Sequence, residues 1–179
     1  MDAKHSLKYP IGLEPQINEP SAAQLDEWIY DIESFPFRLA AQCEGSTREQ
    51  LNWRYRPEGW TLKQLVHHCA DSHLNAFIRF KLAITEENPT IRPYAEALWA
   101  ETSEAKDDDI APSLQLIEAI HHKWTLLLKG LNEEQWQRSF YHPEHQKSFS
   151  LKQSLASYAW HCRHHLAHFS LGLASGGKY

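Results

Sequence analysis

The segment Ser150–Leu173 reads SLKQSLASYAWHCRHHLAHFSLGL and decides the fold class. It opens with a capping box, in which the Ser150 hydroxyl accepts from a first-turn N–H and the side chain of Gln153 reaches back to the cap. Apolar side chains then recur at helical spacing and form a stripe made of Leu151, Leu155, Tyr158, Cys162, Phe169 and Leu173. This pattern predicts a long amphipathic helix with one face in the core.

Three more segments show the same kind of pattern. Capping boxes at Ser21 and Thr61 open helices that we expect to run from about 22 to 44, with Pro36 bending the first, and from 62 to about 85. A further helix is expected over 112–129, with a proline in its first turn and a glycine after its end. Short helices are predicted near 94–99 and 132–138, and no alternating strand pattern exceeds a few residues. The predicted fold is all-α, a four-helix bundle with short extra helices.

The domain organisation is expected to be simple. Residues 1–20 contain three prolines and no clear period, which predicts an extended N-terminal arm lying on the domain. Residues 21–179 form one helical domain, in which 104–109 is a charged, exposed linker. A chain of 179 residues can bury a core without a structural metal, so a metal here would serve function rather than folding.

Composition argues against several classes of protein. The 18 Lys and Arg residues are scattered and outnumbered by 23 Asp and Glu, so a nucleic-acid surface is not expected. No run of eighteen apolar residues predicts a membrane span, and no apolar run behind the N-terminus predicts a signal peptide. Three widely separated cysteines suit a reducing compartment. We therefore expect a cytoplasmic protein without membrane or nucleic-acid partners.

Histidines carry the chemical signal, because seven of the twelve fall in two clusters on predicted helices. His161 and His165 are four apart, so they lie one turn from each other on one face and can bind one divalent metal ion. On a helical wheel of about 100° per residue this pair borders the core stripe. His164 and His168 are also four apart but point further out, as surface residues would.

The third ligand is ambiguous from the pattern alone. On the wheel of the helix over 62–85, His73 lies in the middle of the apolar stripe and His68 on its shoulder, while His67 points to the far side. His73 is therefore either a buried hydrogen-bonded histidine or a ligand, and His68 is its rival. Phosphate-binding loops, CxxC pairs and the motifs G-x-S-x-G and H-E-x-x-H are missing from the sequence.

Two motifs together resemble a known family. Residues 59–68 read GWTLKQLVHH and are followed by Ala70-Asp71-Ser72-His73, and the last helix carries Tyr158-x-Trp160-His161-x-x-His164-His165. Both resemble the motifs of the DinB/YfiT-like proteins, in particular the YfiT branch. The similarity extends over nearly the whole chain.

The resemblance implies a four-helix bundle, a homodimer and one divalent metal per chain held by three histidines. On the matching positions these ligands are His68, His161 and His165. Zinc is the first candidate metal and nickel the alternative, since three imidazoles do not select between them. His164 and His168 are then groups behind the ligands or plain surface residues.

The resemblance also suggests an activity. Proteins of the YfiT branch are described as metal-dependent hydrolases acting on small molecules, and wider relatives include bacillithiol-type thiol S-transferases that use a low-molecular-weight thiol co-substrate. A metal on three neutral histidines activates water in the first case and a thiol in the second. Asn75 and Arg79 lie on the His68 side of their helix and are candidates for orienting the substrate, or else ordinary surface residues.

Two further classes compete with an enzyme. A non-catalytic metal-binding module predicts a closed fourth ligand, for which Cys69, Cys162 and another histidine are candidates. A helical interaction protein predicts histidines that bind no stoichiometric metal. An enzyme instead predicts an open coordination position that faces a pocket.

Overall fold

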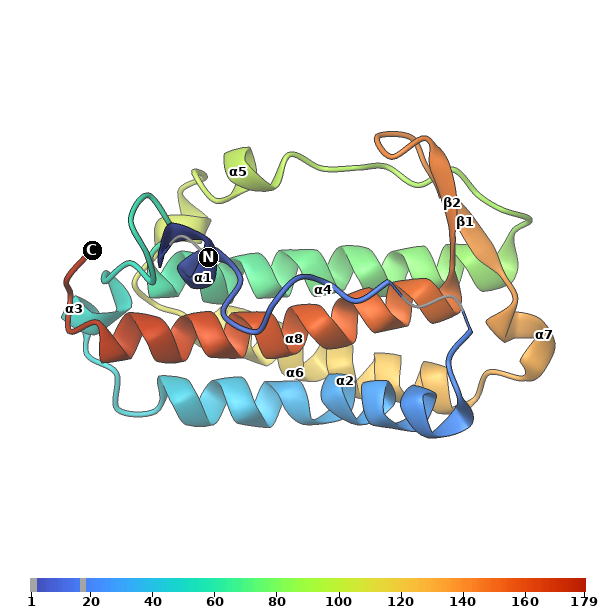
Figure 1. The fold of residues 1–179 in the computed structure, drawn as a ribbon, viewed down its shortest axis with the longest axis horizontal. Helices are drawn as coiled ribbons and strands as arrows, with labels where there is room; N and C mark the ends of the chain where they lie inside the picture. Colours follow the sequence, from blue (N-terminus) through green and yellow to red (C-terminus); the bar gives the residue numbers. More distant parts are fainter. Residues whose placement is uncertain (1–2, 17–18) are drawn as a thin grey trace.

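A computed structural model of the chain describes residues 3–16 and 19–179. Its frame consists of four long helices, α2 (Ala22–Cys43), α4 (Leu62–Thr85), α6 (Ala111–Lys129) and α8 (Leu151–Ala174), which lie side by side in Figure 1. Helix α2 packs against α6 and α8, and α4 packs against the same two helices. Thus α2 and α4, consecutive long helices in the sequence, occupy opposite corners of the bundle. The predicted four-helix bundle is confirmed.

The predicted helix starts are confirmed at the level of single hydrogen bonds. Ser21, Thr61 and Ser150 each accept from the backbone N–H three residues later, and the glutamine at that position accepts from the cap's own N–H. These caps satisfy N–H groups that have no partner inside the helix. As expected, Pro36 lies inside α2, so the N–H that would bond to Ile32 is missing.

Short elements connect and cover the bundle. They are α1 (Ala3–Lys8), α3 (Arg48–Leu51), α5 (Glu96–Trp99), the 3-10 turn η1 (Glu104–Lys106) and α7 (Glu133–Trp136). The helix α1 corrects the expectation of a wholly extended arm over 1–20, of which residues 1, 2, 17 and 18 lie outside the described part of the chain. The expected linker over 104–109 is largely exposed, although Ala105 is buried and Asp108 binds Lys63 and Asn52.

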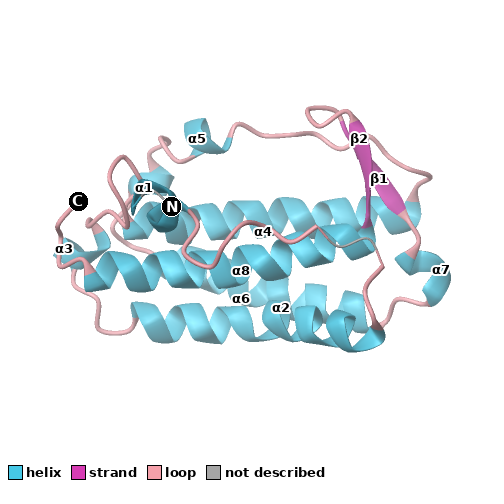
Figure 2. Cartoon of the chain, viewed as in Figure 1, coloured by secondary structure: helices cyan, strands magenta, loops and turns pink. Residues whose placement is uncertain are grey.

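A β-hairpin was not expected from the sequence. Strand β1 (Ser139–His142) pairs antiparallel with β2 (Lys147–Ser150), and Phe140 faces Phe149 across the ladder. Figure 2 shows the hairpin in magenta at one end of the bundle, where β2 runs directly into α8. Its strands of four residues each are too short to leave a clear period of two. The backbone of Tyr141 also bonds to Pro89 and Ile91, which ties the hairpin to the loop after α4.

The core lies between the four long helices. Its largest fully buried side chains are aromatic, namely Trp124, Phe35, Phe80 and Phe169. A buried carboxylate, Asp31 on α2, is paired with Arg163 on α8 and lies 3.6 Å from Arg38. In the described part of the chain, no helix has the length and apolar character needed to cross a membrane.

Candidate metal centre

Helix α8 presents His161 and His165 to each other as the spacing of four predicted. Their ring centroids are 4.3 Å apart, and the two Nε2 atoms are separated by 3.1 Å. His165 is buried, whereas His161 keeps part of its surface exposed. One turn of helix therefore supplies two imidazole nitrogens aimed at one point.

Helix α4 contributes His68 to the same point. Its Nε2 lies 3.3 Å from Nε2 of His161, and the ring is buried against Trp60. Candidate ligand atoms of His68, His161 and His165 all lie within 4.8 Å of one another. The histidine cluster formed by these three residues is the one that the family resemblance implied.

The donor set of this cluster fits a divalent ion such as zinc. Two nitrogens at the usual Zn–N distance in a tetrahedral site are about 3.4 Å apart, close to the spacings observed here. Burial lowers the pKa of His68 to about 4 and holds the pKa values of His161 and His165 well below the usual histidine value. Each ring is therefore neutral near pH 7, which is the form that binds a metal.

A second group of histidines, His164, His165 and His168, also lies within bonding range of a common point. It shares His165 with the first cluster, and Nε2 of His168 is 3.2 Å from the carbonyl of Leu7 and donates to it. His164 is stacked on Trp160. Both His164 and His168 are buried, which corrects the wheel's placement of them at the surface.

His73 has a different place from the one that the wheel favoured for a third ligand. It is fully buried, and its Nδ1 lies 2.7 Å from Nε2 of His121 on α6. Its Nε2 lies 2.9 Å from Nδ1 of His161. His73 therefore contacts the back of the histidine cluster instead of joining it. No role was expected for His121, because the adjacent residues His121 and His122 lack the spacing of four that places two histidines on one helix face.

Comparison with known proteins places the chain in a family. Residues 22–169 match the family model described as the DinB superfamily. The chain belongs to the DinB superfamily.

Individual relatives are similar over nearly their full length. The chain is 44% identical to "Putative metal-dependent hydrolase YfiT" of Bacillus subtilis (strain 168), covering 92% of this chain and 93% of that protein. It is 47% identical to a protein of Oceanobacillus iheyensis with the same type of name, covering 91% and 94%. The solved structure of YfiT from Bacillus subtilis superposes with a TM-score of 0.92 at 44% identity, covering 96% of this chain and 98% of that one. Its published description also names a four-helix bundle topology.

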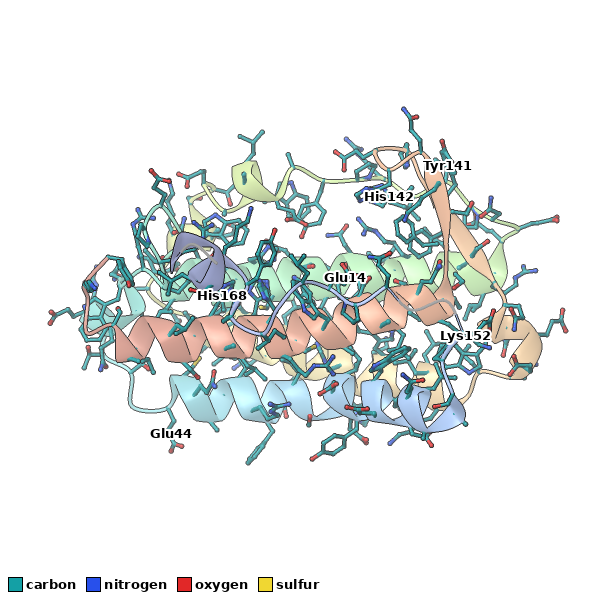
Figure 3. The ribbon with its side chains drawn as sticks, in the orientation of Figure 1. Glu14, Glu44, Tyr141, His142, Lys152 and His168 are labelled. Carbon is teal, nitrogen blue, oxygen red and sulfur yellow. The ribbon has the colours of Figure 1, made fainter. Side chains whose placement is uncertain are left out.

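A cavity of about 400 Å³ opens beside the histidine cluster of this DinB-superfamily bundle. His161 and Tyr158 of α8 line it, together with Ser72 of α4 and His142 of the hairpin. Figure 3 shows His142 on the hairpin and Glu14 on the N-terminal segment that crosses the bundle, and Glu14 also lines the cavity. The volume suits a small molecule, and the cavity reaches the one cluster member whose ring is partly exposed.

The two candidates for orienting a substrate are placed differently. Arg79 lines the cavity. Asn75 does not: its side chain donates to the carbonyl of Asp71 one turn earlier in the same helix. Glu96 also lines the cavity, where burial raises its pKa and the charge of Arg79 acts in the opposite direction.

The candidate cysteine ligands are not part of either histidine group among the described residues. Cys69 and Cys162 are fully buried, and burial raises the pKa of both thiols. A thiol held in its protonated form is a poor metal ligand.

Proposed function

We propose that this protein binds one divalent metal ion, zinc before nickel, through Nε2 of His68, His161 and His165, and that it is a metal-dependent enzyme of the hydrolase type. The observation that carries the proposal is the convergence of three neutral Nε2 atoms at 3.1 and 3.3 Å, at the edge of a cavity. The names of the relatives agree with a metal-dependent hydrolase.

The donor set determines what such a metal would contribute. Three neutral imidazoles leave the positive charge of the ion in place, so that a bound metal lowers the pKa of a water or thiol reaching its open position. The chain itself supplies the rest of the environment. Because His161 lines the cavity, that open position would face the space in which a small molecule fits.

Cavity residues are suited to hold a polar substrate. Arg79 can bind an anionic group, since the described residues place no carboxylate oxygen within 4.0 Å of its guanidinium. Tyr158, whose hydroxyl donates to the carbonyl of Ser72 at 3.3 Å, forms part of the wall next to His161. We expect the substrate to be a small molecule with at least one polar or anionic group.

The first test is metal content of the untagged protein after loading with zinc. We expect about one ion per chain in the wild type and none in His68→Ala, His161→Ala or His165→Ala, because two imidazoles do not hold a structural or catalytic zinc tightly. Circular dichroism should show that each variant keeps its helices, since the core does not depend on the metal. Full occupancy in His165→Ala would contradict the ligand assignment.

The same preparation separates hydrolysis from thiol transfer. Zinc-loaded protein is assayed with ester and amide substrates in buffer, and with an electrophile plus a low-molecular-weight thiol. Turnover of esters or amides that is lost in His161→Ala supports a hydrolase. Turnover that requires the thiol assigns the site to the transferase alternative, and a metal-loaded protein without either activity would leave a non-catalytic binding module.

A further inference from the structure

The carbonyl of Ile32 lacks its usual helical hydrogen bond because of Pro36, so it can accept one from a side chain. In an α-helix this carbonyl would accept a hydrogen bond from the N–H of residue 36, and proline has none. Nδ1 of His121, on α6, lies 2.5 Å from the Ile32 oxygen instead. A carbonyl oxygen can only accept, so the proton of this bond belongs to His121 Nδ1.

That single assignment determines the direction of the next bond. A neutral imidazole with its proton on Nδ1 carries a lone pair on Nε2. Nε2 of His121 therefore accepts from Nδ1 of His73, 2.7 Å away. Both rings are at most 1% exposed, and Phe35 contacts each of them, so water has little access as a competing partner.

The third bond reaches the histidine cluster. With its proton on Nδ1, His73 has a lone pair on Nε2, which accepts from Nδ1 of His161 at 2.9 Å. Nε2 of His161 is then left with its lone pair, and this is the atom that faces His68 and His165. The chain of bonds passes through all four long helices, from α2 to α6, α4 and α8.

We propose that His121 and His73 are positioning residues that hold His161 in the Nδ1–H form and so present its Nε2 lone pair to the metal. The series of hydrogen bonds ends at the Ile32 carbonyl, which lacks a helical partner because of Pro36. Metal-bound histidines commonly donate their other N–H to a carboxylate or carbonyl, which sets the ring's orientation and tautomer. Here two neutral imidazoles carry that influence from a backbone carbonyl across the bundle.

The reverse arrangement, in which donor and acceptor are exchanged in the bonds between the histidines, is disfavoured because it creates a buried charge. His121 would then donate from Nε2 to His73 while Nδ1 still donates to the Ile32 carbonyl. With a proton on both nitrogens, His121 would be a buried imidazolium. No carboxylate is within hydrogen-bonding distance of His121 or His73 in the described part of the chain, so this charge would have no partner. An unpaired buried charge costs far more than one hydrogen bond returns.

The first test reads the tautomers without any metal. In metal-free protein labelled with ¹⁵N-histidine, long-range ¹H–¹⁵N correlation spectra show which ring nitrogen carries the proton. We expect Nδ1–H for His121, His73 and His161. A spectrum in which His161 carries its proton on Nε2 would overturn the inference.

The second test measures zinc affinity by competition with a chelator. His73→Phe removes the acceptor for His161 while keeping a ring in the core, and we expect zinc binding about 10–100-fold weaker. His73→Gln can still donate to His121 through its amide and accept from His161 through its oxygen, so it should recover part of that loss. It also provides a folded variant if His73→Phe does not fold.

A matched control is His67→Phe, because His67 is another buried histidine of α4. Its nitrogens bond to Ser113 and to the carbonyl of Asp107, away from the cluster, so we expect wild-type zinc affinity. Equal losses in His67→Phe and His73→Phe would overturn the positioning role, as would an unchanged affinity in His73→Phe.

The inference rests on the proposed metal site, but the two can fail separately. A wild-type protein that binds no zinc would contradict the proposed function, while the spectra of the metal-free protein would still decide the order of the bonds. Zinc bound with normal affinity together with Nε2–H on His161 would contradict the inference and leave the proposed function intact.

Discussion

His161 has two ring nitrogens with separate tasks. Its Nδ1 bonds to His73 at the back, and its Nε2 faces His68 and His165 at the front. The spacing of four between His161 and His165 could be read from the sequence, because it depends only on the pitch of one helix. The selection of His68 over His73 could not, since both lie near the apolar face of α4 and only the packing of α4 on α8 separates their roles.

We expect His168 to stabilise the fold and not to bind the metal. The ring is buried, stacks on Tyr55 at 4.1 Å and bonds to the carbonyl of Leu7, so His168→Leu should lower the free energy of unfolding by about 1–2 kcal/mol. The zinc content should remain at about one ion per chain. Urea denaturation and metal analysis measure the two effects. If His168→Leu lost its zinc, the metal would instead belong to the second group of histidines, His164, His165 and His168.

The contact between helices α8 and α4 depends on a glycine. A β-carbon built on Gly172 would lie 2.4 Å from Cδ2 and 3.1 Å from Cγ of Leu62, which is fully buried in the first turn of α4. Glycine inside a helix costs about 1 kcal/mol relative to alanine, so its presence here reflects the close approach of the two helices.

We therefore expect Gly172→Ala to destabilise the protein by about 1–2 kcal/mol, because overpacking outweighs the gain in helix propensity. Thermal or urea unfolding of the metal-free protein measures the change. In the Leu62→Ala background the same substitution should become neutral or stabilising, since the collision is gone. A stabilising Gly172→Ala in the wild-type background would contradict this account.

Buried neutral histidines link the stability of the protein to pH. Burial lowers the pKa of His68, His121 and His168 to about 4 and that of His164 to about 3, whereas in the unfolded chain each returns to about 6.5. Between these values the unfolded state binds protons that the folded state does not. Their contribution to stability is complete above pH 6.5 and is lost as the pH falls towards the folded-state pKa.

We expect the free energy of unfolding of the metal-free protein to fall between pH 6.5 and about 4, with each such histidine adding up to about 1.4 kcal/mol per pH unit. Urea denaturation at several pH values measures it. Zinc should move the loss of stability to lower pH, because the ion must be displaced before its ligands are protonated. Equal stability of the metal-free protein at pH 7 and pH 5 would contradict the expectation.

The homodimer implied by the family resemblance and the cytoplasmic location expected from the composition stay predictions. Phe37 of α2 and Leu126 of α6 are exposed apolar side chains that line one groove. Sedimentation analysis of the wild type measures whether the protein is a monomer or a dimer.

Local sequence patterns predicted the four long helices, the capped starts of α2, α4 and α8, and the pair of candidate ligands on the last helix. These features depend on hydrogen bonds and periodicities within a few residues, which a single helix satisfies locally. The contacts between helices depend on tertiary packing, since His68 meets His161 across 93 positions of the sequence and His121 meets Ile32 across 89. Such contacts depend on which helices pack together, and no local pattern records that. The burial of His164 and His168 and the pairing of the short hairpin have the same origin.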